Sequence, residues 1–256
     1  MSRARDHILA AVRSGLGRGT LDQAARRELT RRLARPKANL VPSRVDLDHA
    51  GLTELFVDMA LEAKATVSRV EAETQILAGL PRAVADYLGS RGLSFEVRMA
   101  PDPALEAVPW AEEPRLTIRR GRAEPGDKVS VTCAFAGIAE TGTCMLLSGG
   151  TSPATLNLLV DTHIVVLFAG RIVASYEDAW ARLRERSGRE GGGAVPVMPR
   201  AVTLITGPSR TADIEQTIQM GAHGPRRFHI VLAAQGPPGP GVEGRTAEAR
   251  VHEDAE

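Results

Sequence analysis

Short strand-like runs that alternate with helical stretches are the feature that most constrains this fold. Residues 163–168 form a continuous apolar run, which is typical of a strand buried on both faces of a sheet. Residues 73–90 instead space their apolar side chains at helical intervals. Further strand-like runs lie at 66–70, 95–99, 129–132, 144–147, 201–206 and 228–233, and further helical stretches at 52–64 and 176–185. This alternation predicts an α/β sheet covered by helices on both faces.

The composition is that of an ordinary globular protein with few cysteines. With 256 residues, 43% of them apolar, the chain can form one large α/β domain or two small ones. We expect no membrane span, because no run approaches the ~20 apolar residues that cross a bilayer. Cys133 and Cys144 are the only cysteines, which excludes a disulfide framework and predicts a cytoplasmic setting. An iron–sulfur cluster of the cubane type takes about four thiolates, so this chain alone cannot hold one in the usual way.

Three regions differ in charge and pattern. Residues 1–44 form a basic helical arm and linker, residues 45–235 the α/β domain, and residues 236–256 a tail that we expect to be disordered. Residues 1–45 carry a net charge of +8, although the whole chain carries only +1. The arm lacks interleaved aromatic residues and any motif that reads nucleic acid. We therefore expect its apolar stripes to pack on protein, either its own domain or a partner, and not on nucleic acid.

The segment 206–215 carries the most distinctive chemistry. It follows a strand-like run and opens a stretch with helical spacing at Ile214 and Ile218, which predicts a strand, a glycine turn and a helix N-terminus. Unpaired backbone N–H groups and the helix dipole favour an anion at such a point. The candidate anion-binding residues here are Gly207, Ser209, Arg210 and Asp213. The alternative is structural, with Ser209 or Asp213 capping the helix and Gly207 making the turn.

A second candidate cluster surrounds Glu140. A carboxylate between glycines at a strand edge can act as nucleophile, general base or hydrogen-bond acceptor, and its alternative is a turn acid bonded to local N–H groups. His223 is the second catalytic candidate, whereas His163 opens a buried run and is interpreted as a core residue. The candidate ligand-binding residues around these two are Gly137, Thr141, Gly142, Thr143, Gly224 and Arg226.

Several common site motifs are missing from the sequence. There is no HExxH or CxxC motif and no close His/Asp/Glu spacing, so we predict no metal site. There is no G-x-x-x-x-G-K-[ST] motif, which excludes a P-loop mechanism. No G-x-G-x-x-G motif opens a helix, which argues against a dinucleotide oxidoreductase that acts alone.

Taken in order, four segments resemble the LutC/YkgG family, lactate-utilisation protein C. They are residues 137–143, 163–166, 206–215 and 221–226, and the resemblance covers roughly residues 45–233 together with an amphipathic N-terminal helix. It implies a LUD domain with the open three-layer α/β/α sheet of the NagB/RpiA/CoA-transferase-like type. The chain departs from the family pattern at 149–153, where a more basic segment is expected, and at Ala222, where valine is commoner.

The resemblance also implies a function. It implies a subunit that works with LutA-like and LutB-like proteins in oxidising L-lactate to pyruvate, with the iron–sulfur clusters on those partners. Glu140, Thr141, Gly142 and the turn at 207–213 would line a pocket for a small carboxylate or other anion, with His223 and Arg226 opposite. Whether the chain also forms a homo-oligomer is left open.

Two other functions stay in view at this point. One is a stand-alone transferase or ligase that acts on a carboxylate, acyl-CoA or phosphorylated compound through Glu140, which rests on fold analogy. The other is a regulatory or scaffold protein with a vestigial pocket.

Overall fold

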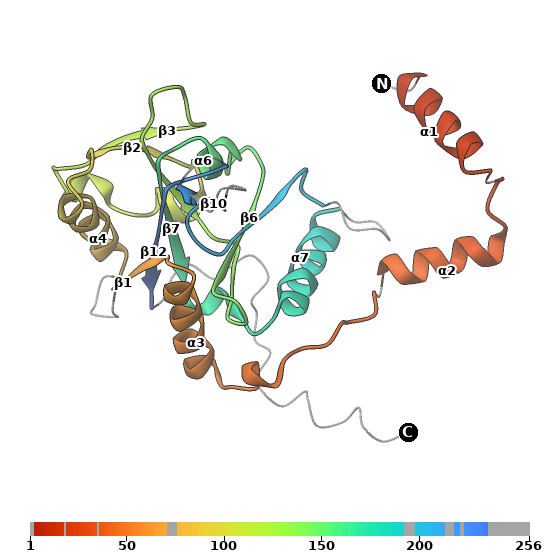
Figure 1. Ribbon diagram of the computed structural model, residues 1–256, viewed down its shortest axis with the longest axis horizontal. Coiled ribbons are helices and arrows are strands. Elements are labelled where there is room, and N and C mark those ends of the chain that lie inside the picture. The colour runs from red at the N-terminus through yellow and green to blue at the C-terminus, as the bar shows by residue number, and fades with distance from the viewer. Residues whose placement is uncertain are drawn as a thin grey trace.

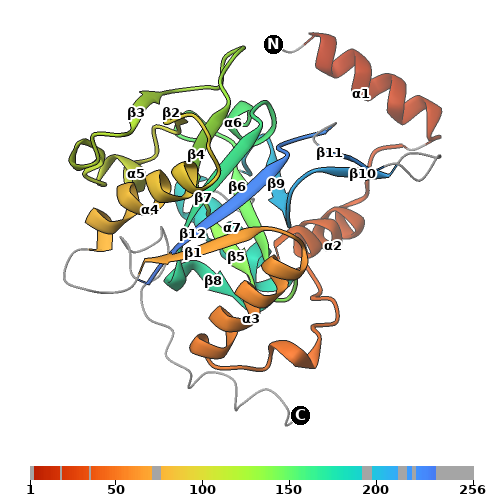
Figure 2. The same ribbon diagram turned by 60° about the vertical axis from the view of Figure 1, so that its left-hand side comes forward.

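A six-stranded parallel sheet forms the centre of the α/β domain in the computed structural model (Figures 1 and 2). The structure describes residues 3–17, 19–34, 36–70, 76–191, 198–212, 218–220 and 223–234. In sheet order the strands are β1 (Thr66–Val70), β12 (Arg227–Ala233), β7 (Thr162–Phe168), β4 (Val129–Cys133), β2 (Glu96–Met99) and β3 (Thr117–Arg120). Every residue of β7 is buried, which confirms the strand predicted from its apolar run.

Both faces of this sheet are covered. On one face α4 (Ile76–Ser90) packs against Ile164, Val166 and Phe168 of β7. On the other face α3 (His49–Glu62) packs against Val165 and Leu167, because successive strand residues point to opposite faces. The predicted helix-covered α/β sheet is confirmed.

A second, four-stranded sheet adds a layer that the sequence did not predict. Its order is β8 (Ile172–Val173), β5 (Ala136–Ile138), β6 (Thr143–Leu147) and β9 (Val202–Ile205). Cys144 and Leu146 of β6 pack together with α3 against the main sheet. Met145, on the opposite face of β6, packs against α7 (Tyr176–Gly191). The second sheet is therefore sandwiched between the main sheet and α7.

The segment after Gly207 differs from its prediction. Arg210–Ala212 forms β10 and Ile218–Met220 forms β11, and these pair as an antiparallel two-stranded sheet. The predicted helix is therefore wrong over these residues. The spacing of Ile214 and Ile218 suits a helix, but such branched side chains also favour strands, and pairing between the two arms of the segment decides the outcome.

The two helices expected in the arm are present as α1 (Arg3–Gly15) and α2 (Gln23–Ala34). Figure 1 shows both helices apart from the α/β domain. Downstream of them, Arg44 Nη2 donates to the carbonyl of Glu140 at 2.7 Å and ties the linker to the domain. Within the described part of the chain, no helix is long and apolar enough to cross a membrane. The tail predicted at 236–256 lies outside the described residues.

Candidate functional site

Two of the predicted motifs meet at the C-terminal end of α3. Gly142 has φ +65°, and a Cβ there would collide with the backbone of Ala60. A Cβ at Gly207 would likewise collide with the carbonyl of Ala63. Glycine is therefore required at both positions by close backbone approach. The two segments therefore lie against the same end of α3.

Four hydroxyl groups connect the same segments. Thr143 Oγ1 lies 2.7 Å from Thr141 Oγ1, 2.8 Å from Thr206 Oγ1 and 3.1 Å from the Tyr176 hydroxyl. Tyr176 opens α7, so the cluster joins the 139–142 turn, the end of β9 and the start of α7. Sequence reasoning did not single out Tyr176, because nothing in its local sequence marks this contact.

Glu140 lies at the N-terminus of α7. Its Oε2 accepts a hydrogen bond from the backbone N–H of Tyr176 at 3.3 Å, and its own N–H donates to the carbonyl of Ala174 at 3.0 Å. A carboxylate at this end of a helix is stabilising. The carboxylate thus bonds a backbone N–H of a distant segment and not one of its own turn, and the catalytic role of Glu140 stays a prediction.

The residues around Ser209 also come together, though not at a helix N-terminus. Ser209 Oγ accepts from the N–H of His223 at 3.3 Å, and Gly224 lies against the Ser209 side chain. Arg210 Nη2 donates to the carbonyl of Ala63 at 2.9 Å. Because a strand begins at Arg210, the helix-dipole argument for an anion here is wrong. Asp213 lies outside the described residues, and Arg226 is exposed.

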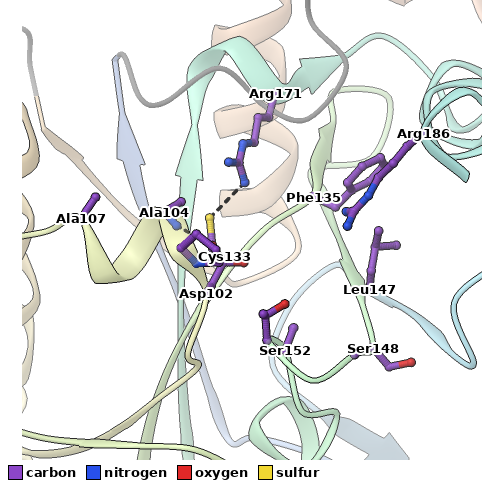
Figure 3. A pocket seen from close by; sticks show the side chains of 13 residues that line it. Asp102, Ala104, Ala107, Cys133, Phe135, Leu147, Ser148, Ser152, Arg171 and Arg186 are labelled. Atoms are coloured by element: carbon purple, nitrogen blue, oxygen red, sulfur yellow. Dashed lines mark hydrogen bonds between the residues drawn. The ribbon is translucent and has the colours of Figure 1, made fainter. Parts of the chain in front are cut away.

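A cavity of about 550 Å³ opens at a different place, beyond the C-terminal ends of β2 and β4 (Figure 3). None of the predicted site residues lines it. Its lining comprises Asp102, Pro103, Ala104, Ala107, Cys133, Phe135, Leu147, Ser148, Gly149, Thr151, Ser152, Arg171 and Arg186.

Strand order explains why a cavity forms there. Strands β2 and β4 are neighbours in the sheet. The strand that follows β2 in this sheet is β3, at the outer edge, whereas the strand that follows β4 in this sheet is β7, on the other side. Ligands of open α/β sheets bind in the crevice that such a switch point creates. The sequence could not reveal this crevice, because it depends on which strands become neighbours.

Arg171 is the charged centre of the cavity. It ends the 3₁₀ turn η3 (Ala169–Arg171) directly after β7 and is only 7% exposed. Its Nη1 donates to the carbonyl of Ala134 at 2.7 Å and to Cys133 Sγ at 3.1 Å, and its guanidinium carbon lies 5.0 Å from the centroid of the Phe168 ring. Buried Nε has no hydrogen-bond partner. Among the described residues no carboxylate lies within salt-bridge distance of Arg171.

Two more arginines come from α7. Arg182 and Arg186 lie 6.0 and 5.7 Å from the centroid of the Phe135 ring. Arg182 Nη1 donates to the carbonyl of Arg171 at 3.3 Å. Burial, and then the charge of Arg171, lower the pKa of Arg182 below its ordinary value. Arg182 is thus linked to Arg171, and it shares the Phe135 ring with Arg186.

Asp102 and Cys133 also belong to the polar part of the lining, with Ser148, Thr151 and Ser152. Asp102 caps the short helix α5 (Pro103–Glu106), with Oδ1 accepting from the N–H of Ala104 at 2.8 Å. Figure 3 shows Asp102 and Arg171 on either side of Cys133. Burial raises the pKa of the Cys133 thiol to about 12, so the thiol is neutral at pH 7 and is not an activated nucleophile.

Neither cysteine has the character of a metal ligand. Burial also raises the pKa of the Cys144 thiol. Across the described ranges, no three His, Cys, Asp or Glu side chains are grouped so as to hold a metal ion.

Comparisons with known proteins agree with the motifs and the fold. The LUD domain family model matches residues 111–233. Lactate utilization protein C of Deinococcus radiodurans is 30% identical over 200 residues, which cover 75% of this chain and 84% of that protein. Lactate utilization protein C of Geobacillus sp. WCH70 is 34% identical over 104 residues, only 41% of each chain. An uncharacterized protein of Neisseria meningitidis is 40% identical over 100 residues, 39% of each chain.

One solved structure shares the fold. A crystal structure of a DUF162 family protein from Deinococcus radiodurans matches with a TM-score of 0.50 and 25% identity, covering 73% of this chain and 98% of that one. The resemblance read from the four motifs is thus confirmed. The chain belongs to the LUD domain family of lactate utilization proteins C.

Proposed function

We propose that this chain is a non-redox component of a system that oxidises L-lactate to pyruvate, and that it binds an organic carboxylate at Arg171. The observation that carries the proposal is the buried Arg171 guanidinium, which lines a switch-point cavity and has no carboxylate partner among the described residues. A buried charge without a counter-charge is costly, and a bound anion removes that cost. The names of the relatives supply the link to lactate.

The cavity has a hydrogen-bond partner for the carboxylate of a 2-hydroxy acid and another for its hydroxyl group. Arg171 uses only Nη1 for its bonds to described residues, which leaves Nη2 as a donor for a carboxylate. Asp102 uses only Oδ1 within the described part of the chain, so its second oxygen can accept from the hydroxyl group. A charge-assisted hydrogen bond of this kind contributes about 1.5–3 kcal/mol, or roughly tenfold to a hundredfold in affinity.

The electron-transfer chemistry belongs elsewhere in this proposal. The sequence supplies two thiols where a cubane cluster takes about four, and burial disfavours the thiolate at both. These residues do not fit an iron–sulfur cluster. We therefore place the clusters on LutA-like and LutB-like partner subunits, which receive the electrons as lactate is oxidised.

The test is titration calorimetry of the full chain with L-lactate. Arg171→Met should lower the affinity for L-lactate at least tenfold. Arg171→Lys keeps the charge but loses the planar guanidinium, so its affinity should lie between those of the wild-type chain and Arg171→Met. Arg119→Met, an exposed arginine remote from the cavity lining, should leave the affinity unchanged. Circular dichroism and the melting temperature check that each variant is folded.

The same titration shows whether L-lactate binds in the cavity or at the motif site predicted from the sequence. L-lactate binding that is lost in Arg210→Met and kept in Arg171→Met would place the ligand at the end of α3 and contradict this proposal. Glu140 accepts a hydrogen bond from the first backbone N–H of α7 and does not line the cavity, so the cavity gives the transferase alternative no support.

A further inference from the structure

The cavity is much larger than lactate. Its 550 Å³ corresponds to about 18 water molecules at ~30 Å³ each, whereas lactate has only about six non-hydrogen atoms. A lactate held between Arg171 and Asp102 leaves most of this space filled with water. The size of the cavity thus indicates a larger ligand.

Part of the wall away from Arg171 is apolar, and it lies beside the polar residues Ser148, Thr151, Ser152 and Arg186. The α5 segment contributes Pro103, Ala104 and Ala107, and the second sheet contributes Leu147. Figure 3 shows Ala104 and Ala107 on one side of the cavity, and Leu147 with the Phe135 ring on the other. Small side chains on α5 opposite large ones on the sheet leave a space that an apolar group can fill. An apolar wall of this kind favours contact with the carbon skeleton of a ligand.

We propose that the ligand of this cavity is a 2-hydroxy acid with a bulky apolar side chain, larger than lactate. The inference rests on the proposed function, because Arg171 and Asp102 hold the carboxylate and hydroxyl group as described above. The side chain of the acid then lies between Ala107 and Leu147. This protein consequently binds long-chain or aromatic relatives of lactate more tightly than lactate itself.

The preference has a measurable size. Burying an aromatic side chain improves affinity by roughly tenfold to a hundredfold. L-3-phenyllactate should therefore bind that much more tightly than L-lactate in calorimetric titrations of the full chain. Benzyl alcohol, which has the ring but no carboxylate, should not bind measurably.

A matched pair of variants locates the side chain of the ligand. Ala107 is exposed at the C-terminal end of α5, so Ala107→Phe fills the cavity mouth without disturbing the core. This variant should abolish the preference for phenyllactate and leave L-lactate affinity within about twofold, a change too small to reflect a lost contact. Ala111→Phe, at another exposed position that does not line the cavity, should change neither affinity.

The outcomes separate the inference from the proposed function. If L-lactate binds in an Arg171-dependent way but phenyllactate binds no more tightly, the inference is overturned and the proposed function stands. A preference that survives Ala107→Phe also overturns it. If neither acid binds, the proposed function itself fails.

Discussion

Two buried histidines should make the stability of this protein fall steeply between pH 6.5 and 5. His163 is fully buried in β7, with Nε2 2.7 Å from Thr132 Oγ1 and Nδ1 unpartnered. Burial lowers its pKa to about 3. His229 is stacked on Tyr87 with ring centroids 3.7 Å apart, and burial lowers its pKa to about 4. Both are therefore neutral in the folded state across this range.

The sign of the effect follows from proton binding. In the unfolded chain both imidazoles recover a pKa near 6.5, so below that pH the unfolded state binds protons that the folded state excludes. Stability is complete above pH 6.5 and is lost as the pH falls toward the folded values. Each histidine contributes a slope of up to about 1.4 kcal/mol per pH unit, hence about 2.7 for the pair.

At pH 5 the loss amounts to about 4 kcal/mol, since each group lies about 1.5 units below its unfolded pKa. That is a large part of a typical unfolding free energy of about 5–15 kcal/mol. Urea unfolding at pH 7.5, 6 and 5 measures it directly. His229→Gln, which keeps groups able to bond Thr66 and Ser68, should halve the slope. A free energy of unfolding that is flat from pH 7 to 5, or a slope that His229→Gln leaves unchanged, would refute the reasoning.

Two other predictions concern the turn and the arm. Gly142→Ala should cost about 3 kcal/mol or more and lower the melting temperature by roughly 6–12 °C, because it combines a left-handed backbone with a clash at Ala60. Gly188→Ala, with open space around it, should not lower the melting temperature. Deleting residues 1–40 should weaken binding to the proposed partner subunits without lowering that temperature, since Ile8 and Leu33 are 60% and 61% exposed on helices apart from the domain. Tight, salt-sensitive DNA binding lost on that deletion would contradict the protein-contact role.

The sequence predicted the helix-covered α/β sheet because burial on two faces leaves a direct trace in composition. The run at β7 is apolar at nearly every position, and His163 reads correctly as a core residue. The prediction of a helix after Gly207 was wrong because its sequence signal is weak. Its pattern there is short, and a pairing partner only a few residues away outweighed the local helical spacing.

Arg171 could not have been found in the same way. It follows Ala169 and Gly170 in a short turn, and nothing nearby distinguishes it from the other arginines of the chain. Its burial depends on β4 lying beside β7, which brings the carbonyl of Ala134 and the thiol of Cys133 within reach. Only the three-dimensional arrangement of distant segments makes this arginine unusual.

The recognised motif and the arginine cavity are nevertheless mechanically connected. Gly137 of β5 pairs with Ile172, the residue directly after Arg171. Glu140 holds the first backbone N–H of α7, and Thr141 and Thr143 hold the hydroxyl group of Tyr176 in its first turn.

From that fixed start, α7 carries Arg182 back to the carbonyl of Arg171 and places Arg186 against Phe135 in the cavity wall. The glycines and hydroxyl groups of the 137–143 motif therefore determine where the cavity arginines lie, although none of them lines the cavity. A motif that identifies the family can in this way mark the framework of a binding site whose charged residue lies some thirty positions downstream, at Arg171.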